Sequence, residues 1–85
     1  MELEQINNRL DDLSAVISYD FILEKKHFTP GEKIAINQER GALTDRRYVL
    51  NGDMEPGTER KYKISEALDK KVQFVLKKIK NETNK

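Results

Sequence analysis

The stretch Asn-Gly-Asp-Met-Glu-Pro-Gly-Thr, residues 51–58, separates two segments whose apolar residues recur at helical spacing. Gly52 stands where a helix commonly ends in the left-handed conformation, and the following Pro56-Gly57 opposes its continuation. Thr58 then offers the side chain of a helix N-cap. These features predict a helical hairpin turned at this stretch.

The helix before the turn is expected from about residue 30 to residue 51, and its start is marked most clearly. Thr29 and Glu32 have the spacing of a capping box, and Pro30 stands at the first helical position, where its missing N–H matters least. Glu39 and Arg46 fall in the middle of the apolar arc of this helix. We expect each of them either to extend its charge to solvent or to pair with a charge on a neighbouring helix or subunit.

Two further amphipathic helices complete the predicted all-α fold, at about residues 3–26 and 58–81. The apolar stripe of the first is Leu3, Ile6, Leu10, Leu13, Ile17 and Phe21. The stripe of the last is Ile64, Leu68, Val72, Val75, Leu76 and Ile79. We expect one helical domain over residues 1–85, with residues 29–81 as the hairpin and 1–26 as an oligomerisation arm. The first stripe also fits a helix packed inside its own bundle.

An α-β-β-β-α arrangement stays open as an alternative, because residues 33–37, 48–51 and 60–64 are each compatible with a short strand. The capping box and the 3.6-residue periodicity over about twenty residues favour the all-α fold.

Composition limits the classes of function. The 85 residues contain 36% charged residues that balance to +1, with no Cys and one His. The near-neutral charge argues against nucleic acid as a partner, and no apolar run suits a membrane span. Without thiols, a phosphate loop or a paired acid and base, we expect a non-enzymatic cytoplasmic protein with no metal and no cofactor. So small a core favours a homo-oligomer.

One face of the predicted second helix carries groups that bind nucleotides in other proteins. Arg40, Thr44, Arg47 and Tyr48 share this face by helical spacing. Guanidinium groups grip phosphates, and an aromatic ring stacks on a base. The alternative is an ordinary solvated face. Gly41 lies in the middle of the same helix, where it marks a close approach by another backbone or by a ligand.

Part of the chain resembles a known family. Pro-Gly-Thr-Glu-Arg-Lys at 56–61 and the segment 66–82 are similar to the last helix of small helical-hairpin phage proteins that act as cyclic-nucleotide sponges against bacterial CBASS and Thoeris immunity. That helix begins Pro-Asp-Ser-Arg-Glu and continues Leu-Glu-Glu-Ala-Val-Met-Trp-Ala-Asn-Ala-Ala-Ile in the family. The sequence departs from the family where Phe74 replaces Trp and where Glu59-Arg60 reverses the order Arg-Glu. Residues 1–26 have no counterpart.

The resemblance implies a homo-oligomer, often a hexamer in the family, that sequesters a cyclic di- or trinucleotide or glycocyclic ADP-ribose without cleaving it. By position, Phe28 would stack on a base and Arg40 would hold a phosphate between subunits. Thr58 and Arg60 would line a second pocket. A phage-encoded protein of this kind would work in the host cytoplasm.

A second class of function stays open on the residues alone. A small helical interaction module, either an inhibitor or a structural adaptor, would act through the Leu3–Phe21 stripe.

Overall fold

A computed structural model describes residues 3–22 and 27–83 of the chain. It contains three helices, α1 (Leu3–Ile22), α2 (Pro30–Leu50) and α3 (Glu66–Thr83), and these described ranges hold no strand. The all-α class is therefore confirmed, and the β-containing alternative is wrong for this part of the chain. The part of the predicted first helix at 23–26 lies outside the described residues.

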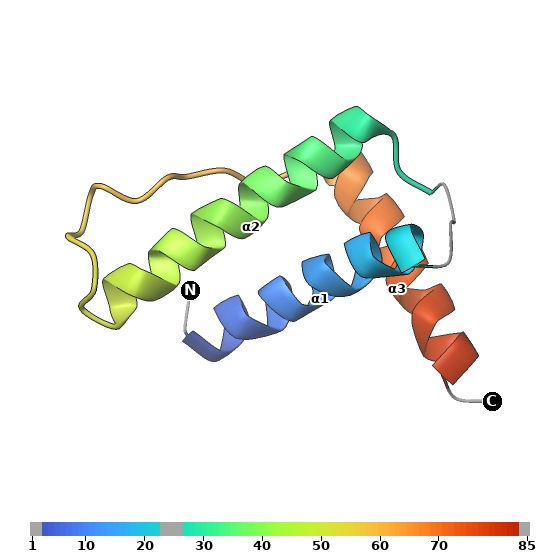
Figure 1. The fold of residues 1–85 in the computed structure, drawn as a ribbon, viewed down its shortest axis with the longest axis horizontal. Helices are drawn as coiled ribbons and strands as arrows, with labels where there is room; N and C mark the ends of the chain where they lie inside the picture. Colours follow the sequence, from blue (N-terminus) through green and yellow to red (C-terminus); the bar gives the residue numbers. More distant parts are fainter. Residues whose placement is uncertain (1–2, 23–26, 84–85) are drawn as a thin grey trace.

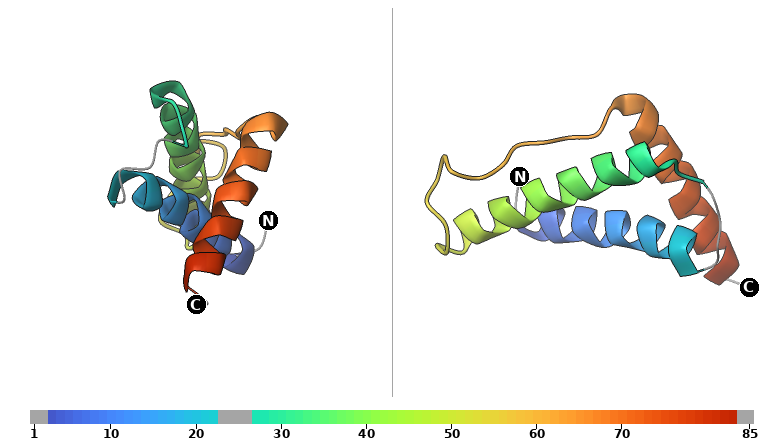
Figure 2. Two further views of the ribbon diagram at one scale, coloured as in Figure 1. Left: turned by 90° about the vertical axis from the view of Figure 1, so that its right-hand side faces the viewer. Right: turned by 45° about the horizontal axis from the view of Figure 1, so that its top comes forward.

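The arrangement centres on α1. In Figure 1, α1 and α2 run antiparallel, and α3 crosses them where α1 ends and α2 begins. Figure 2 shows the same arrangement from two other directions. Helix α1 packs against both other helices, whereas α2 and α3 contact each other only weakly. The helical hairpin is thus formed by α1 and α2, and the predicted pairing of residues 29–51 with 58–81 is corrected.

Helix α2 begins and ends as the sequence predicts. The Thr29 Oγ1 accepts a hydrogen bond from the Glu32 amide at 3.1 Å, and the Glu32 Oε1 accepts one from the Thr29 amide at 2.8 Å. At the other end Gly52 has a φ of 82°, a left-handed conformation that glycine adopts without strain. Local chemistry alone sets both ends of this helix.

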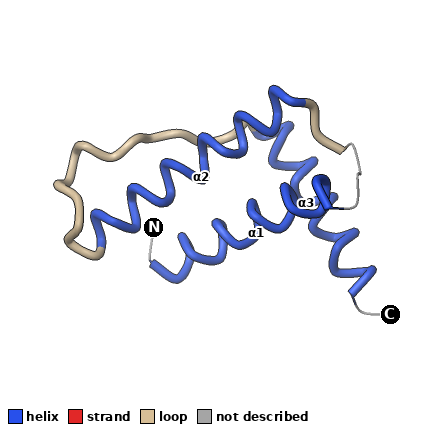
Figure 3. The backbone as a smooth tube through the Cα atoms, viewed as in Figure 1, coloured by secondary structure: helices blue, strands red, loops and turns tan. Residues whose placement is uncertain are grey.

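Helix α3 begins at Glu66 and not near Thr58, which is the main error of the predicted fold. The Thr58 hydroxyl donates to the Glu55 carbonyl at 2.7 Å and so closes a turn. Ser65 is the residue that caps α3, because its Oγ accepts the Leu68 amide hydrogen at 3.2 Å. Residues 51–65 form the connection between α2 and α3, drawn as the tan segment that runs back along α2 in Figure 3.

Two carboxylates of α2 hold this connection in a non-helical path. The Arg60 amide donates to Asp45 Oδ2 at 3.0 Å, and the Ile64 amide donates to Glu39 Oε1 at 3.0 Å. Amides bound in this way satisfy their hydrogen-bonding requirement without helix formation. We use the name strap for residues 59–64, the part of the connection that these two bonds fix to α2.

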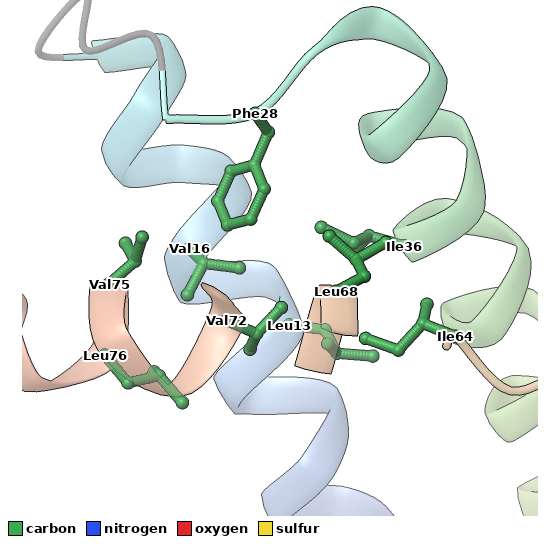
Figure 4. Packing of buried hydrophobic residues seen from close by; sticks show 9 residues of the cluster. All are labelled: Leu13, Val16, Phe28, Ile36, Ile64, Leu68, Val72, Val75 and Leu76. Atoms are coloured by element: carbon green, nitrogen blue, oxygen red, sulfur yellow. The ribbon is translucent and has the colours of Figure 1, made fainter. Parts of the chain in front are cut away.

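The hydrophobic core lies where the three helices meet (Figure 4). Its buried members are Leu13, Val16, Phe28, Ile36, Ile64, Leu68, Val72, Val75 and Leu76. Full burial of an aliphatic side chain contributes about 1.5–3 kcal/mol, so this cluster is the main source of stability. The predicted stripe of the last helix is confirmed as core, although Ile64 lies before the start of α3 and Ile79 packs at the margin of the cluster.

The stripe of α1 is also used mainly inside the molecule. Ile6 and Leu13 are fully buried, while Phe21 is 81% exposed at the end of the helix. The alternative of a helix packed in its own bundle therefore describes the middle of α1. None of the described helices has both the length and the hydropathy that crossing a bilayer would demand.

Candidate functional site

Phe28 lies in the core and not at the surface. Its side chain is only 4% exposed, and Figure 4 shows its ring directed toward Val16. The Phe28 amide is held by the buried carboxylate of Asp20 at 3.0 Å. In this structure the ring is not available to stack on a base, so the stacking role that the resemblance implies for Phe28 does not fit.

Thr58 and Arg60 are both engaged in internal bonds. The Thr58 hydroxyl closes the turn described above. Arg60 forms a bidentate ion pair with Asp45, in which Nε lies 2.8 Å from Oδ2 and Nη2 lies 3.1 Å from Oδ1. These hydrogen bonds lower the pKa of Asp45 to about 2 and raise the pKa of Arg60. The guanidinium is therefore already paired with a carboxylate, although the Arg60 side chain is 71% exposed. The second pocket that the resemblance implies stays a prediction.

Gly41 allows Arg60 to take this position. A Cβ at Gly41 would lie 3.2 Å from three atoms of the Arg60 guanidinium, and Arg60 Nη2 lies 3.4 Å from the Gly41 carbonyl oxygen. The expected close approach at Gly41 is therefore present, but a side chain of the strap makes it. Neither a backbone nor a ligand is required to explain this glycine.

The remaining predicted residues lie along one side of α2, where Arg40, Thr44 and Arg47 are half-buried. Arg40 donates to the side-chain oxygen of Asn37 at 2.8 Å, and Arg47 donates to that of Asn7 on α1 at 3.3 Å. The Thr44 hydroxyl donates its proton to the Arg40 carbonyl at 2.8 Å. The Thr44 hydroxyl oxygen can therefore act toward a ligand only as a hydrogen-bond acceptor. Tyr48 is 43% exposed on the same face.

The charge on this face has no acidic partner within the described residues. The two arginines bond only to neutral amides, whereas Arg9, Arg46 and Arg60 each pair with a carboxylate. Arg40 and Arg47 are seven residues apart, and Lys33 precedes Arg40 by the same spacing, so it lies on the same side of the helix. No described carboxylate lies within ion-pair distance of Lys33. We call Lys33, Arg40 and Arg47 the cationic row. Successive members lie about 10 Å apart along the helix axis.

Lys33 was missed in the sequence, although the signal was present. It precedes Arg40 by seven residues, as Arg40 precedes Arg47, and a repeat of seven keeps side chains on one face over two turns. The structure thus keeps Arg40, Thr44, Arg47 and Tyr48 together, adds Lys33, and separates them from Phe28, Thr58 and Arg60.

The charged residues inside the apolar arc of α2 pair with neighbouring segments. Glu39 is 4% exposed and accepts from Arg9 Nε at 2.7 Å. Arg9 Nη1 also lies 2.8 Å from Asp69 Oδ1 of α3, as an ion pair whose angle is not that of an ordinary hydrogen bond. Arg46 Nη1 lies 3.8 Å from Glu59 Oε1. Pairing with a neighbouring helix is therefore confirmed for Glu39, and its pair with Arg9 links all three helices through Asp69. The partner of Arg46 lies in the connection between α2 and α3 and not on a helix.

No family model, curated protein or solved structure matches the chain in comparisons with known proteins. The resemblance to the sponge family therefore stays a prediction from motifs. In the described ranges, no group of three or more acidic or imidazole side chains is placed to hold a metal ion.

Proposed function

We propose that the protein is a non-enzymatic binder that captures cyclic-nucleotide second messengers through the side of α2 that carries Arg40 and Arg47. The observation that supports this most is the pairing of Arg40 and Arg47 with neutral amides only. Two guanidinium groups without acidic partners attract phosphodiester groups, which carry a permanent negative charge. Tyr48 provides an exposed ring beside them for a base.

Capture without cleavage suits the chemistry of these side chains. Arginine stays protonated at all physiological pH values, so it holds a phosphate but cannot act as a general base. Thr44 already donates its hydroxyl proton to the Arg40 carbonyl. We therefore expect the ligand to be released unchanged when the protein is denatured, as a phage sponge against cyclic-nucleotide immunity requires.

The proposal includes a homo-oligomer. Phe21 is 81% exposed and Ile22 is 71% exposed, and burying large apolar side chains is the usual driving force of subunit association. Light scattering after size exclusion measures the assembly directly. A Phe21→Asp substitution should reduce the mass to that of a smaller species, because a buried carboxylate opposes the contact. An unchanged mass would remove this end of α1 from the interface.

Calorimetry with cyclic dinucleotides, cyclic trinucleotides and glycocyclic ADP-ribose tests the ligand. Arg40→Gln and Arg47→Gln should each weaken binding by about tenfold or more, which is about 1.4 kcal/mol. Arg46→Gln is the matched control, because it removes a guanidinium that already has a carboxylate partner. The proposal fails if a folded protein binds none of these ligands. It also fails if the control weakens binding as much as the two test variants.

The exposed end of α1 also supports the second class, a protein-interaction module. Because Leu13 is fully buried, its substitution would unfold the protein and test nothing about partners. Phe21→Asp is the informative change. If it abolishes activity in cells while Arg40→Gln and Arg47→Gln have no effect there, the interaction module replaces the sponge.

A further inference from the structure

The strap has one edge that is bonded to α2 and a second edge that faces away from it. The amides of Arg60 and Ile64 donate to carboxylates of α2, and no turn or bend interrupts residues 60–65, which run along α2 in Figure 3. In an extended strand the amides alternate between two edges, so residues two or four apart share an edge. The spacing of four fits this repeat and not the three-residue repeat of a polyproline helix. The amides of Lys61 and Lys63 therefore face the other edge.

This second edge, which we call the free edge of the strap, has unused backbone groups. The amides of Lys61 and Lys63 form no hydrogen bond within the described residues, and both residues are exposed. An unpaired edge of extended chain is a template on which another chain adds a strand. In an antiparallel pair, each of the two lysines would exchange both of its backbone hydrogen bonds with the residue opposite. The free edge thus offers a place for a short added strand.

The side chains at the free edge carry unpaired positive charge. Those of Lys61 and Lys63 lie on one face of the strap, because successive side chains of a strand alternate. Neither lysine has a carboxylate within ion-pair distance in the described part of the chain. The acidic neighbour Glu59 has a side chain that is only 8% exposed and lies 3.8 Å from Arg46. Glu66 follows at the first position of α3 and offsets at most one of the two charges. Positive charge is therefore in excess at this edge.

The opposite face of the strap carries an exposed aromatic ring. Tyr62 is 43% exposed and lines two cavities, of about 360 and 470 Å³, to which Leu43 of α2 also contributes. A strand added to the free edge would place one side chain on this face, opposite Tyr62. Aromatic and β-branched side chains pair favourably across neighbouring strands. The strap thus matches a segment in which an apolar residue stands between two acidic residues.

We propose that the free edge of the strap binds an extended acidic segment of a partner protein by strand addition. The segment pairs with residues 61–63, with carboxylates opposite Lys61 and Lys63 and an apolar side chain opposite Tyr62. A second copy of the chain is a poor occupant, because two straps paired antiparallel about Tyr62 would place lysine opposite lysine, and like charges in that position destabilise a strand pair. The strap contains no residue of the cationic row, so this interaction does not depend on the proposed function.

The peptide Glu-Val-Glu-Val-Glu, blocked at both ends, tests the proposal by amide hydrogen exchange measured with NMR. When nine-tenths of the protein is bound, exchange at the amides of Lys61 and Lys63 should slow about tenfold, because only the unbound tenth exchanges. Exchange at the Tyr62 amide, which lies on the edge toward α2, should change by less than about twofold. Absence of slowing, or equal slowing at all three amides, would overturn the proposal.

A second peptide separates strand addition from general attraction between charges. Glu-Glu-Glu-Val-Val has the same composition and charge but lacks the alternation that a strand requires. It should bind at least about tenfold more weakly than the alternating peptide. Equal binding of the two peptides would contradict strand addition. Slowed exchange at Lys61 and Lys63 that appears without peptide, and that increases with protein concentration, would instead identify a second copy as the occupant and overturn the acidic partner.

Two substitutions at one position separate the backbone contribution from the charge. Lys61→Gln and Lys61→Pro both remove the charge, but only proline also removes the amide hydrogen, and it is compatible with extended chain. Lys61→Gln should weaken binding of the alternating peptide about threefold, and Lys61→Pro about tenfold or more. Lys77→Gln, at an exposed lysine of α3 outside the strap, is the control and should have no effect. Equal binding by the Lys61→Gln and Lys61→Pro variants would overturn the proposal. If Lys61→Pro fails to fold, the exchange pattern of the wild-type protein still decides the result.

Discussion

Helix α1 and the strap each form an ion pair with a carboxylate of α2, but the two ion pairs differ in their surroundings. Glu39 meets Arg9 between helices, where their side chains are 5% and 16% exposed. Asp45 meets Arg60 at the edge of the molecule, where the arginine side chain is 71% exposed. The two carboxylates are six residues apart on one helix and both are buried, at 4% and 7% exposure, but the arginine that meets Glu39 is enclosed whereas the arginine that meets Asp45 is exposed to water.

This difference determines what each ion pair does for the protein. Water largely screens a pair at the surface, so such a pair contributes little to stability and mainly sets the path of the chain. A charge that is shielded from water is stabilised by its partner and not by solvent, so loss of that partner leaves an uncompensated buried charge. We therefore expect changes at the hairpin to act on the stability of the whole fold, and changes at the strap to act locally.

The largest effect on stability is expected at Phe28, just before the start of α2. Phe28→Ala should lower the free energy of unfolding by about 4 kcal/mol, because it removes a buried ring from the core. Urea denaturation followed by circular dichroism measures this loss. Phe74→Ala is the control, since that ring is 57% exposed and its removal should change stability by less than about 0.5 kcal/mol. If Phe28→Ala left stability unchanged but abolished ligand binding, Phe28 would be the stacking residue that the resemblance implies.

The second largest effect on stability is expected at Glu39, whose arginine partner is enclosed. Arg9→Ala leaves Glu39 buried without its cation and should lower the free energy of unfolding by about 3 kcal/mol. Arg46→Ala is the matched change at an exposed arginine, 3.8 Å from Glu59, and should alter stability by less than about 0.5 kcal/mol. Equal losses in the two variants would show that the interior and the edge of α2 do not differ as the structure indicates.

The distance along the chain between bonded groups explains which parts of the fold were predictable from the sequence. Helix α2 was predicted to within one residue because its capping box and its terminal glycine act within a few residues of the chain. The start of α3 was not, because it depends on Asp45 and Glu39, which are 15 and 25 residues away from the amides that they bind. Local patterns contain no information on such distant partners.

The candidate site was predictable to a similar extent. Helical periodicity placed Arg40 and Arg47 on one face, and the same periodicity would have found Lys33. The engagement of Arg60 with Asp45 could not be read from periodicity, because it depends on how the strap crosses α2. The burial of Phe28 likewise depends on tertiary packing. Function stays a prediction, since neither the fold nor the comparisons test it.

A smaller effect is expected from acid. The hydrogen bonds from Arg60 lower the pKa of Asp45 from 3.8 to about 2, so its contribution to stability is complete above pH 4 and is lost as the pH falls toward 2. Backbone amides also lower the pKa of Glu32 and of Glu59, so the wild-type protein should lose stability in acid through several groups. Denaturation at a series of pH values should show a shallower loss for Asp45→Asn between pH 4 and 2. An identical pH dependence would mean that the pair with Arg60 does not persist in solution.

The smallest effect is expected where the strap touches α2. Alanine is about 1 kcal/mol better than glycine inside a helix, but a Cβ at Gly41 would lie 3.2 Å from the Arg60 guanidinium. Gly41→Ala should therefore stabilise the wild-type protein by less than this amount, because the new methyl group must displace the arginine. In an Arg60→Ala background the obstacle is absent, and the same substitution should give the full gain of about 1 kcal/mol. The four proteins of this cycle, compared by urea denaturation, measure the contact itself. A gain that is equal in both backgrounds would mean that Arg60 leaves Gly41 freely, and that the strap is attached to α2 by its backbone alone.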